Sequence, residues 1–383
     1  MSYRHKRKSL FPLIIIFVFL FIANGCAQRK NTIVHPTATQ SATPLVNTTP
    51  TAYLQDIAGL VYKIDNKLWM VGEDGNSHLL FNLPKDAYTL DVQFEENNVK
   101  IVYEHQDDIW ISDVNTQEQR NLTNTSDRIE RFPQFWTERS GVVLFASELR
   151  KENSFDSFSG APTTINTNGE NYQVLDENGG EKFLFSPDGR RVAYHLPQKL
   201  IAIYDWETSQ TEFIDTNLYE LPPGRQEGIW IQSWSPDERY LAGWIKGYLS
   251  YGEKYQFGIG IIDLKSKTSR LLHVYSPFAG GDIPPGIVWS LDGQWMAFSM
   301  RSEPDFPGEI ISLWVARADG TEDVRIGKGI NPIWSPNGSQ LAYDRKVKAL
   351  VDGIWIYDLE TRLQYKTFLP NEAKLIDWIS LIP

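Results

Sequence analysis

The motif FSPDGRRVAY, at residues 185–194, decides the fold of this chain because it occurs four times. The other copies read WSPDERYLAG at 234–243, WSLDGQWMAF at 289–298 and WSPNGSQLAY at 334–343. In each copy an aromatic residue ends one strand, a polar turn follows, and a second apolar strand begins. Pro presets the second position of a type I turn, Asp or Asn accepts hydrogen bonds from nearby amides, and Gly supplies a left-handed residue. The motif therefore predicts a tight β-hairpin whose structural turn residues are Asp188, Asp237, Asp292 and Asn337.

A second hairpin lies about twenty residues further on, where an aromatic or β-branched strand runs into Asp-x-x-Thr or Asp-x-x-Ser, as at Asp205 and Asp358, or into a Gly turn, as at Asp319-Gly320. Each unit thus contains four short strands, which we name a, b, c and d. Two weaker copies keep the same frame near residues 94 and 136. The aromatic residues that end strand a recur at intervals of 42 to 55 residues: Phe94, Trp136, Phe185, Trp234, Trp289, Trp334 and Trp378. A four-stranded unit at this period predicts a β-propeller blade.

The two ends of the repeat region complement each other. Residues 60–81 contain strands b, c and d without a strand a, and residues 375–380 supply a strand a with nothing after it. We therefore predict an all-β propeller of seven four-stranded antiparallel blades, closed by pairing of the C-terminal strand with the N-terminal blade. Closure of this kind removes exposed sheet edges. A six-bladed ring with an unpaired C-terminal strand stays open as the alternative.

The repeated motif resembles the Pro-Asp repeat of TolB-like β-propellers over roughly residues 55–383. The resemblance implies the propeller fold. The separate N-terminal α/β domain of TolB has no counterpart in residues 31–52, so the resemblance does not imply a role in a Tol–Pal complex. The propeller of prolyl-oligopeptidase-like peptidases is also similar, but those peptidases need a hydrolase domain, and we expect none after the last blade.

The N-terminal segment is typical of an exported lipoprotein. Basic residues at 4–8 precede an apolar run at 10–23, which is shorter than the roughly 20 residues of a membrane-spanning helix. The run ends in Ala23-Asn24-Gly25-Cys26, which resembles a bacterial lipobox, although Asn24 departs from the usual pattern. We predict a signal peptide at 1–25, lipidation of Cys26, a Thr/Pro-rich linker at 26–52 and a propeller domain at 53–383. An uncleaved hydrophobic anchor is the alternative.

Charge and composition exclude several classes of function. The chain has 37 Lys and Arg against 48 Asp and Glu, and its formal net charge is −11. A negative field repels phosphate backbones, so we expect no nucleic-acid partner and no membrane contact beyond the lipid anchor. A single cysteine excludes intramolecular disulfides.

No sequence motif indicates catalysis. The chain contains no Gly-x-Ser-x-Gly, His-Glu-x-x-His or Walker motif, and the histidines of the repeat region are scattered singly through different blades. We therefore predict no catalytic residue, no metal site and no cofactor. Acidic residues are abundant, so a dispersed pair of catalytic carboxylates stays open.

Loop lengths indicate where a partner would bind. In an antiparallel blade the a–b and c–d turns emerge on one face, and the b–c and d–a connections on the other. We call the second face the long-loop face because it holds most of the long insertions, at 148–162, 246–256, 275–286 and 301–309. Aromatic and Arg side chains on such loops are typical of recognition surfaces, although these rings could also pack their own loops. The candidate binding residues are Arg150, Phe155, Phe158, Tyr248, Tyr251, Tyr255, Phe278, Arg301 and Phe306.

These observations together favour a monomeric, lipid-anchored extracytoplasmic propeller that binds a protein or glycan partner and catalyses no reaction. A glycan lyase or hydrolase with a dispersed site in the central funnel is the alternative. A purely structural sensor or scaffold module is a third possibility.

Overall fold

A computed structural model describes eleven segments of the chain, and all regular structure within them is β-strand. The described residues are 57–95, 98–136, 141–150, 160–176, 180–196, 200–216, 226–247, 256–275, 286–301, 311–347 and 350–380. The predicted signal peptide, Cys26 and the linker lie outside these segments. Within them, no helix is long and apolar enough to cross a membrane.

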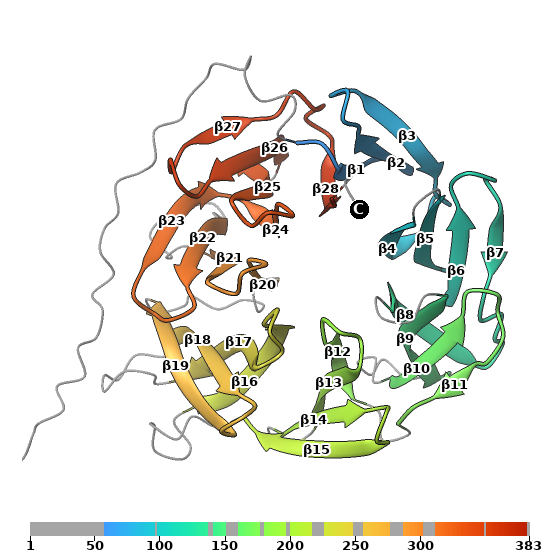
Figure 1. Cartoon of the computed structure of the whole chain (residues 1–383), viewed down its shortest axis with the longest axis horizontal. Helices are drawn as coiled ribbons and strands as arrows, with labels where there is room; N and C mark the ends of the chain where they lie inside the picture. The colour runs from blue at the N-terminus through green and yellow to red at the C-terminus, as the bar shows by residue number, and fades with distance from the viewer. Residues whose placement is uncertain are drawn as a thin grey trace, which may run out of the picture. The chain divides into compact units, whose positions relative to one another are not determined.

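The strands form seven four-stranded antiparallel sheets that follow one another around a ring (Figure 1). From the inner to the outer strand, blade 1 contains β28 (Lys374–Trp378), β1 (Leu60–Ile64), β2 (Lys67–Val71) and β3 (Ser77–Asn82). Blade 2 contains β4 (Tyr88–Glu95), β5 (Asn98–His105), β6 (Asp108–Asp113) and β7 (Gln119–Asn121). Blade 3 contains β8 (Arg128–Phe135), β9 (Val142–Leu149), β10 (Ala161–Asn166) and β11 (Gln173–Val174).

The remaining four blades, like blades 2 and 3, are each formed by four consecutive strands. Blade 4 contains β12 (Glu181–Phe185), β13 (Arg191–Leu196), β14 (Leu200–Asp205) and β15 (Gln210–Asp215). Blade 5 contains β16 (Gln226–Trp234), β17 (Tyr240–Gly247), β18 (Gln256–Asp263) and β19 (Thr268–Tyr275). Blade 6 contains β20 (Ile287–Trp289), β21 (Trp295–Arg301), β22 (Ile311–Arg317) and β23 (Asp323–Lys328). Blade 7 contains β24 (Ile330–Trp334), β25 (Gln340–Val347), β26 (Leu350–Asp358) and β27 (Gln364–Lys366).

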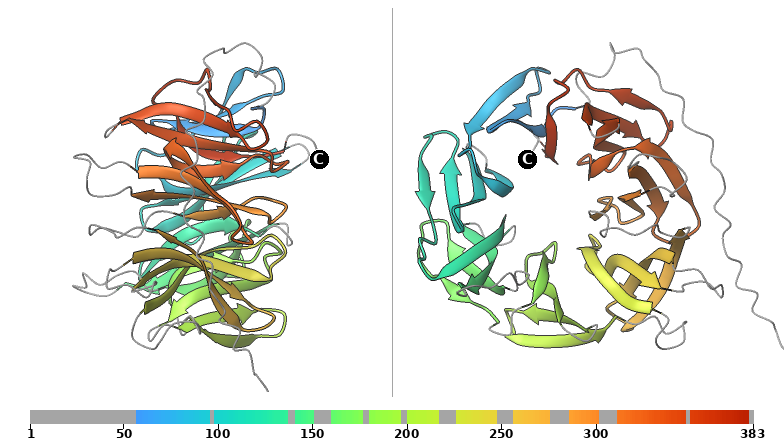
Figure 2. Two further views of the ribbon diagram at one scale, coloured as in Figure 1. Left: turned by 90° about the vertical axis from the view of Figure 1, so that its left-hand side faces the viewer. Right: turned by 180° about the vertical axis from the view of Figure 1, so that it is seen from behind.

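Strand β28 closes the ring, as the sequence predicts. It pairs antiparallel with β1, with Trp378 opposite Leu60, and it lies beside β1 in front and rear views (Figures 1 and 2). Seven blades are therefore confirmed, and the six-bladed alternative is wrong.

The hydrophobic core is divided among the interfaces between successive blades. The buried apolar side chains of the described segments form seven clusters, and each draws on two neighbouring blades. One cluster joins Ile201 and Ile203 of blade 4 to Ile231 and Trp234 of blade 5. Each interface between blades therefore buries apolar surface, which stabilises the fold by about 25 cal/mol per Å².

The Ser-Pro-Asp-Gly turns are held together by their own side chains. In the first, Ser186 Oγ donates to Asp188 Oδ1 at 2.5 Å and accepts the Arg191 N–H at 2.8 Å, while Asp188 Oδ1 also accepts the Arg190 N–H at 2.8 Å. The same bond from Ser Oγ to a side-chain Oδ1 recurs at Asp237, Asp292 and Asn337, with lengths of 2.5 to 2.7 Å. The Ser and the Asp or Asn side chains therefore form hydrogen bonds within the turns, as expected for structural residues.

Indole groups satisfy backbone oxygens at the inner edge. Trp234 Nε1 donates to the carbonyl of Leu184 in the preceding blade at 2.8 Å, and Trp334 Nε1 donates to that of Val288 at 3.2 Å. An inner strand has one unpaired edge, so these donors replace hydrogen bonds that a neighbouring strand would make.

The predicted frame is wrong in blades 2 and 3. In the regular blades the anchor aromatic pairs with the first apolar residue of strand b, as Trp234 pairs with Leu241. The equivalent residues are Val92, opposite Ile101, and Phe135, opposite Val143, rather than Phe94 and Trp136. Both hairpins lack the Pro-Asp-Gly turn. In blade 2 the two strands pair beyond the anchor position, so Phe94 lies opposite Val99. The indole of Trp136 instead packs against Trp206 of blade 4, with ring centroids 4.6 Å apart.

Within the described segments, a bulge interrupts the inner strand of six blades, two or three residues before the anchor. At three bulges a buried side chain on strand b of the preceding blade accepts the freed backbone N–H. We call these side chains the bridging acceptors: Glu104 accepts from Phe132 at 2.7 Å, His195 from Ile231 at 2.9 Å and Asp344 from Leu375 at 3.0 Å. Each follows the buried Tyr of its strand b, so this position connects one blade to the next.

Candidate functional site

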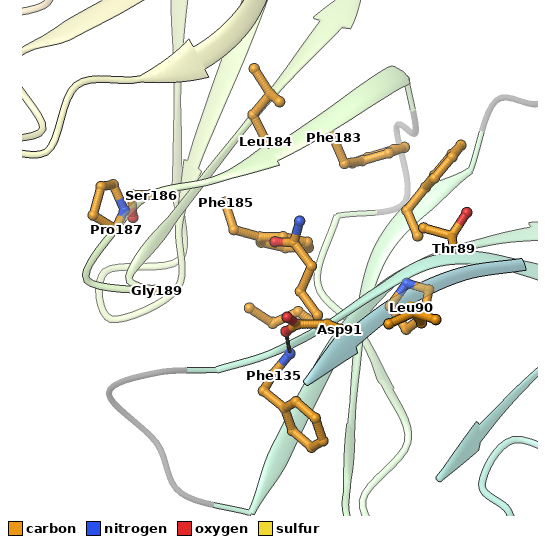
Figure 3. A pocket seen from close by; sticks show the side chains of 14 residues that line it. Thr89, Leu90, Asp91, Phe135, Phe183, Leu184, Phe185, Ser186, Pro187 and Gly189 are labelled. Carbon is orange, nitrogen blue, oxygen red and sulfur yellow. Dashed lines mark hydrogen bonds between the residues drawn. The ribbon is translucent and has the colours of Figure 1, made fainter. Parts of the chain in front are cut away.

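A cavity of about 510 Å³ lies where the inner strands of blades 2, 3 and 4 meet. Its wall consists of Thr89–Asp91 of β4, Phe132–Phe135 of β8, Leu144 of β9, and Phe183–Pro187 with Gly189 around the end of β12. The wall thus combines the bulge region of two blades with the a–b turn of a third (Figure 3). A volume of this size is within the usual range of small-ligand sites.

Phe132 occupies an unusual backbone conformation on this wall. It lies at the bulge of β8 with φ of +58°, and its side chain is 41% exposed. A bulky side chain at positive φ costs roughly 1–3 kcal/mol and persists only when its surroundings enforce it. Glu104 enforces it here, because its carboxylate accepts the Phe132 N–H. In blade 7 the equivalent residue is Asn331, a type that tolerates the same φ region, here +53°.

Asp91 is the ionisable residue of the cavity wall. Its Oδ1 accepts the Val92 N–H at 2.9 Å and its Oδ2 accepts the Phe135 N–H of blade 3 at 2.8 Å (Figure 3). Burial raises the pKa of Asp91 to about 6 because the surrounding protein disfavours the charged form, and the charge of Asp377 adds to the increase.

Asp377 occupies the equivalent place on the inner strand of blade 1. It also directly precedes its anchor, and its Oδ1 accepts the Trp378 N–H at 2.7 Å. Burial raises its pKa above the ordinary value. Two half-buried carboxylates therefore interact across neighbouring inner strands.

The rest of the wall is largely aromatic and apolar. Four phenylalanines line it, at positions 132, 135, 183 and 185, and Lys, Arg and His are missing from the fourteen lining residues. Ser186 is already engaged in its turn, so Thr89 and Gln134 are the remaining polar side chains.

A charged cluster lies close to the cavity on the long-loop face. Asp107, in the turn between β5 and β6, binds Arg131 at 2.8 Å and Arg150 at 3.1 Å. Arg131 also approaches the bridging acceptor Glu104 at 3.5 Å. Tyr88, which pairs with Glu104, is 63% exposed. Exposed aromatic and Arg side chains thus gather at the blade 2–blade 3 junction.

Of the predicted binding residues, Arg150 is described, and it lies in this cluster. The side chain of Arg301 is outside the described part of the chain, as are the other seven residues: Phe155, Phe158, Tyr248, Tyr251, Tyr255, Phe278 and Phe306. Element bounds place the b–c connections of blades 3, 5 and 6 and the d–a connection after β19 at the predicted insertions.

A second perturbed acid, Glu130, is fully buried between blades 2 and 3. The Thr125 hydroxyl donates to its Oε1 at 2.9 Å, and Tyr172 and Ser147 lie within 3.4 Å. Burial raises its pKa to about 7. Because Glu130 has no solvent contact, it serves packing rather than ligand binding. Sequence reasoning missed Glu130, Asp91 and Glu104, and the one available signal was an acid inside an apolar strand.

Within the described segments, no group of three or more His, Cys, Asp or Glu side chains is arranged to hold a metal ion. The acids on the cavity wall and beside it already accept backbone hydrogen bonds.

Comparison with known proteins shows the fold. No family model matches the chain, and no curated protein matches its sequence. An oligogalacturonate lyase from Vibrio parahaemolyticus is 12% identical with a TM-score of 0.57, covering 83% of this chain and 98% of the lyase. A puromycin-hydrolyzing peptidase from Mycobacterium tuberculosis is 13% identical with a TM-score of 0.55, covering 89% of this chain and 58% of the peptidase.

TolB from Acinetobacter baumannii is also similar, at 15% identity and a TM-score of 0.40, over 78% of this chain and 74% of TolB. Similarity at these identities concerns fold and not activity. The propeller fold that the sequence predicts is confirmed by the seven blades themselves.

Proposed function

We propose that this chain is an exported, lipid-anchored β-propeller that binds a protein or glycan partner and catalyses no reaction. The observation that carries the proposal is Phe132, an aromatic ring held at positive φ on the wall of an aromatic cavity. Strain of this kind is typical of functional positions, because the fold retains it at a cost to stability. The neighbouring Arg150 and Tyr88 extend the surface that a partner would contact.

The enzyme alternative receives less support. A pair of catalytic carboxylates must have an acid and a base free to act on a bound substrate. Asp91 accepts backbone N–H groups from two blades, and Asp377 accepts one. Asp91 thereby links β4 to β8, and the carboxylate of Asp377 forms its hydrogen bond within its own strand.

The decisive experiment compares partner capture by the full-length protein and by its Phe132→Asn variant. Asn is the residue of blade 7 at this position, so we expect the variant to keep its fold, with a free energy of unfolding within about 1 kcal/mol of wild type. The control is Phe213→Asn on the outer strand β15, where the ring is 58% exposed. Partners lost with Phe132→Asn and retained with Phe213→Asn support the proposal.

Two further measurements separate the alternatives. Replacing Tyr248, Tyr251 and Tyr255 by Ala tests the long loops alone. If this triple variant loses partner capture and Phe132→Asn retains it, the partner binds the long loops and not the cavity. Turnover of a polysaccharide by homogeneous protein would establish an enzyme instead.

The proposed anchor has its own test. Cys26→Ser should release the protein from membranes, because lipidation needs the thiol. Retention of the variant in the membrane fraction would indicate an uncleaved hydrophobic segment.

A further inference from the structure

We propose that the cavity binds an organic cation on an aliphatic stem, namely a lysine or arginine side chain of a partner polypeptide. This inference rests on the proposed function and specifies the chemistry of its ligand.

The charge of the cavity wall is complementary to that of a cation. The wall contains the carboxylate of Asp91 and no basic side chain, and Asp377 adds a second negative charge close by. A carboxylate removed from water is costly unless a partner compensates it. Backbone N–H groups occupy one site on each oxygen of Asp91, and a carboxylate offers about four. The free sites suit an ammonium or guanidinium group.

The aromatic rings of the wall suit both the charge and the apolar stem of such a ligand. The wall includes four Phe rings, and Phe132 among them is held in place by Glu104. Aromatic faces attract cations within about 6 Å and also pack against methylene groups. Lysine and arginine combine the two features, because a charged end follows an apolar stem.

The same wall disfavours sugars and anions. A sugar ring brings many hydroxyl groups, and each needs a hydrogen-bond partner when it leaves water. Two side chains of the wall, Thr89 and Gln134, are polar without a role in a turn or between strands. An acidic ligand would meet the charges of Asp91 and Asp377. A basic peptide side chain therefore fits better than a glycan.

The test measures binding of small probes to the full-length protein in lipid nanodiscs by saturation-transfer NMR, with empty nanodiscs as blank. The probes are the N-acetyl methylamides of lysine and norleucine, choline and maltotetraose. Norleucine has the lysine stem without the charge. We expect the lysine probe to bind at least tenfold more tightly than the norleucine probe, and Asp91→Asn and Phe132→Asn each to weaken lysine binding at least tenfold. The control is Glu360→Gln, which removes the same single negative charge as Asp91→Asn but at an exposed position, and it should leave binding unaltered.

Several results would overturn the inference. Equal affinity for the lysine and norleucine probes would show that the cavity is an apolar site. Tighter binding of choline than of the lysine probe would indicate a quaternary ammonium ligand. Tighter binding of maltotetraose would indicate a glycan site. The lysine and norleucine comparison on wild type needs no variant, so misfolding of Asp91→Asn leaves the test intact. Absence of binding by every probe, combined with partner capture that depends on Phe132, would refute this inference and leave the proposed function standing.

Discussion

Replacement of the bridging acceptor Asp344 by Ala should destabilise the closure of the ring. Asp344 is buried in blade 7, where its Oδ1 accepts the Leu375 N–H of β28 at 3.0 Å and its Oδ2 accepts the Asn331 amide at 2.9 Å. Leu375 belongs to the strand that completes blade 1. A single side chain therefore links the bulge of one blade with the closing strand of the next.

The magnitude follows from the groups left without an acceptor. A hydrogen bond to a charged group contributes about 1.5–3 kcal/mol, and an orphaned buried donor incurs its desolvation penalty. Loss of both bonds should lower the free energy of unfolding by about 3–5 kcal/mol, a large share of the roughly 5–15 kcal/mol typical of a folded protein. Asp344→Asn keeps one acceptor oxygen for Leu375 and should cost about 1–2 kcal/mol.

Urea unfolding and amide hydrogen exchange of the full-length protein check this prediction. Exchange at Leu375 should accelerate more than exchange at Ile231, whose N–H is held by His195 in another interface. A cost below about 1 kcal/mol for the Ala variant, or equal acceleration at the two amides, would refute the reasoning.

Three other predictions address the cavity and the blade interfaces. Because the folded-state pKa of Asp91 is raised from 3.8 to about 6, its carboxylate destabilises the fold as pH rises through that window. The unfolding free energy of Asp91→Asn relative to wild type should therefore increase by about 2–3 kcal/mol between pH 4 and pH 7, whereas a constant difference would contradict the shift. Gly189→Ala should lower the free energy of unfolding by about 2–4 kcal/mol, because its Cβ at φ +67° would lie 2.2 Å from the Trp136 indole. The matched control Gly338→Ala, at φ +71° with no atom nearer than 3.8 Å, should lower it by about 1 kcal/mol. Equal shifts of the melting temperature in the two variants would exclude the clash. Trp234→Phe should cost about 1 kcal/mol more than Trp289→Phe in urea unfolding, because the Trp234 indole donates to Leu184, and similar losses would show that packing alone matters.

The architecture was predictable because the signals that specify a blade are local. Ser186, Asp188 and Gly189 form a turn almost entirely by themselves, and the same spacing recurs at Ser335, Asn337 and Gly338. The missing strand at one end and the spare strand at the other predict the pairing of β1 with β28. Where the turn residues are absent, in blades 2 and 3, the predicted frame slips by one or two residues.

The cavity was not predictable because separate segments of three blades build it, between residues 89 and 189. Asp91, Phe132 and Phe183 belong to different blades, and no periodic pattern relates them. Their arrangement depends on the bulges, which change the strand register without changing composition. Phe132 in particular depends on Glu104, a contact between strands that becomes visible only when the blades are packed.

The pairing of β28 with β1 also bears on how the ring assembles. The two strands are separated by more than three hundred residues in the chain, so the edge of β1 stays open while the six intervening blades form. Such an edge accepts any strand of suitable sequence, including β28 of a second copy. Domain-swapped dimers that exchange β28 are therefore the misassembly built into this topology, and dilution during refolding should suppress them.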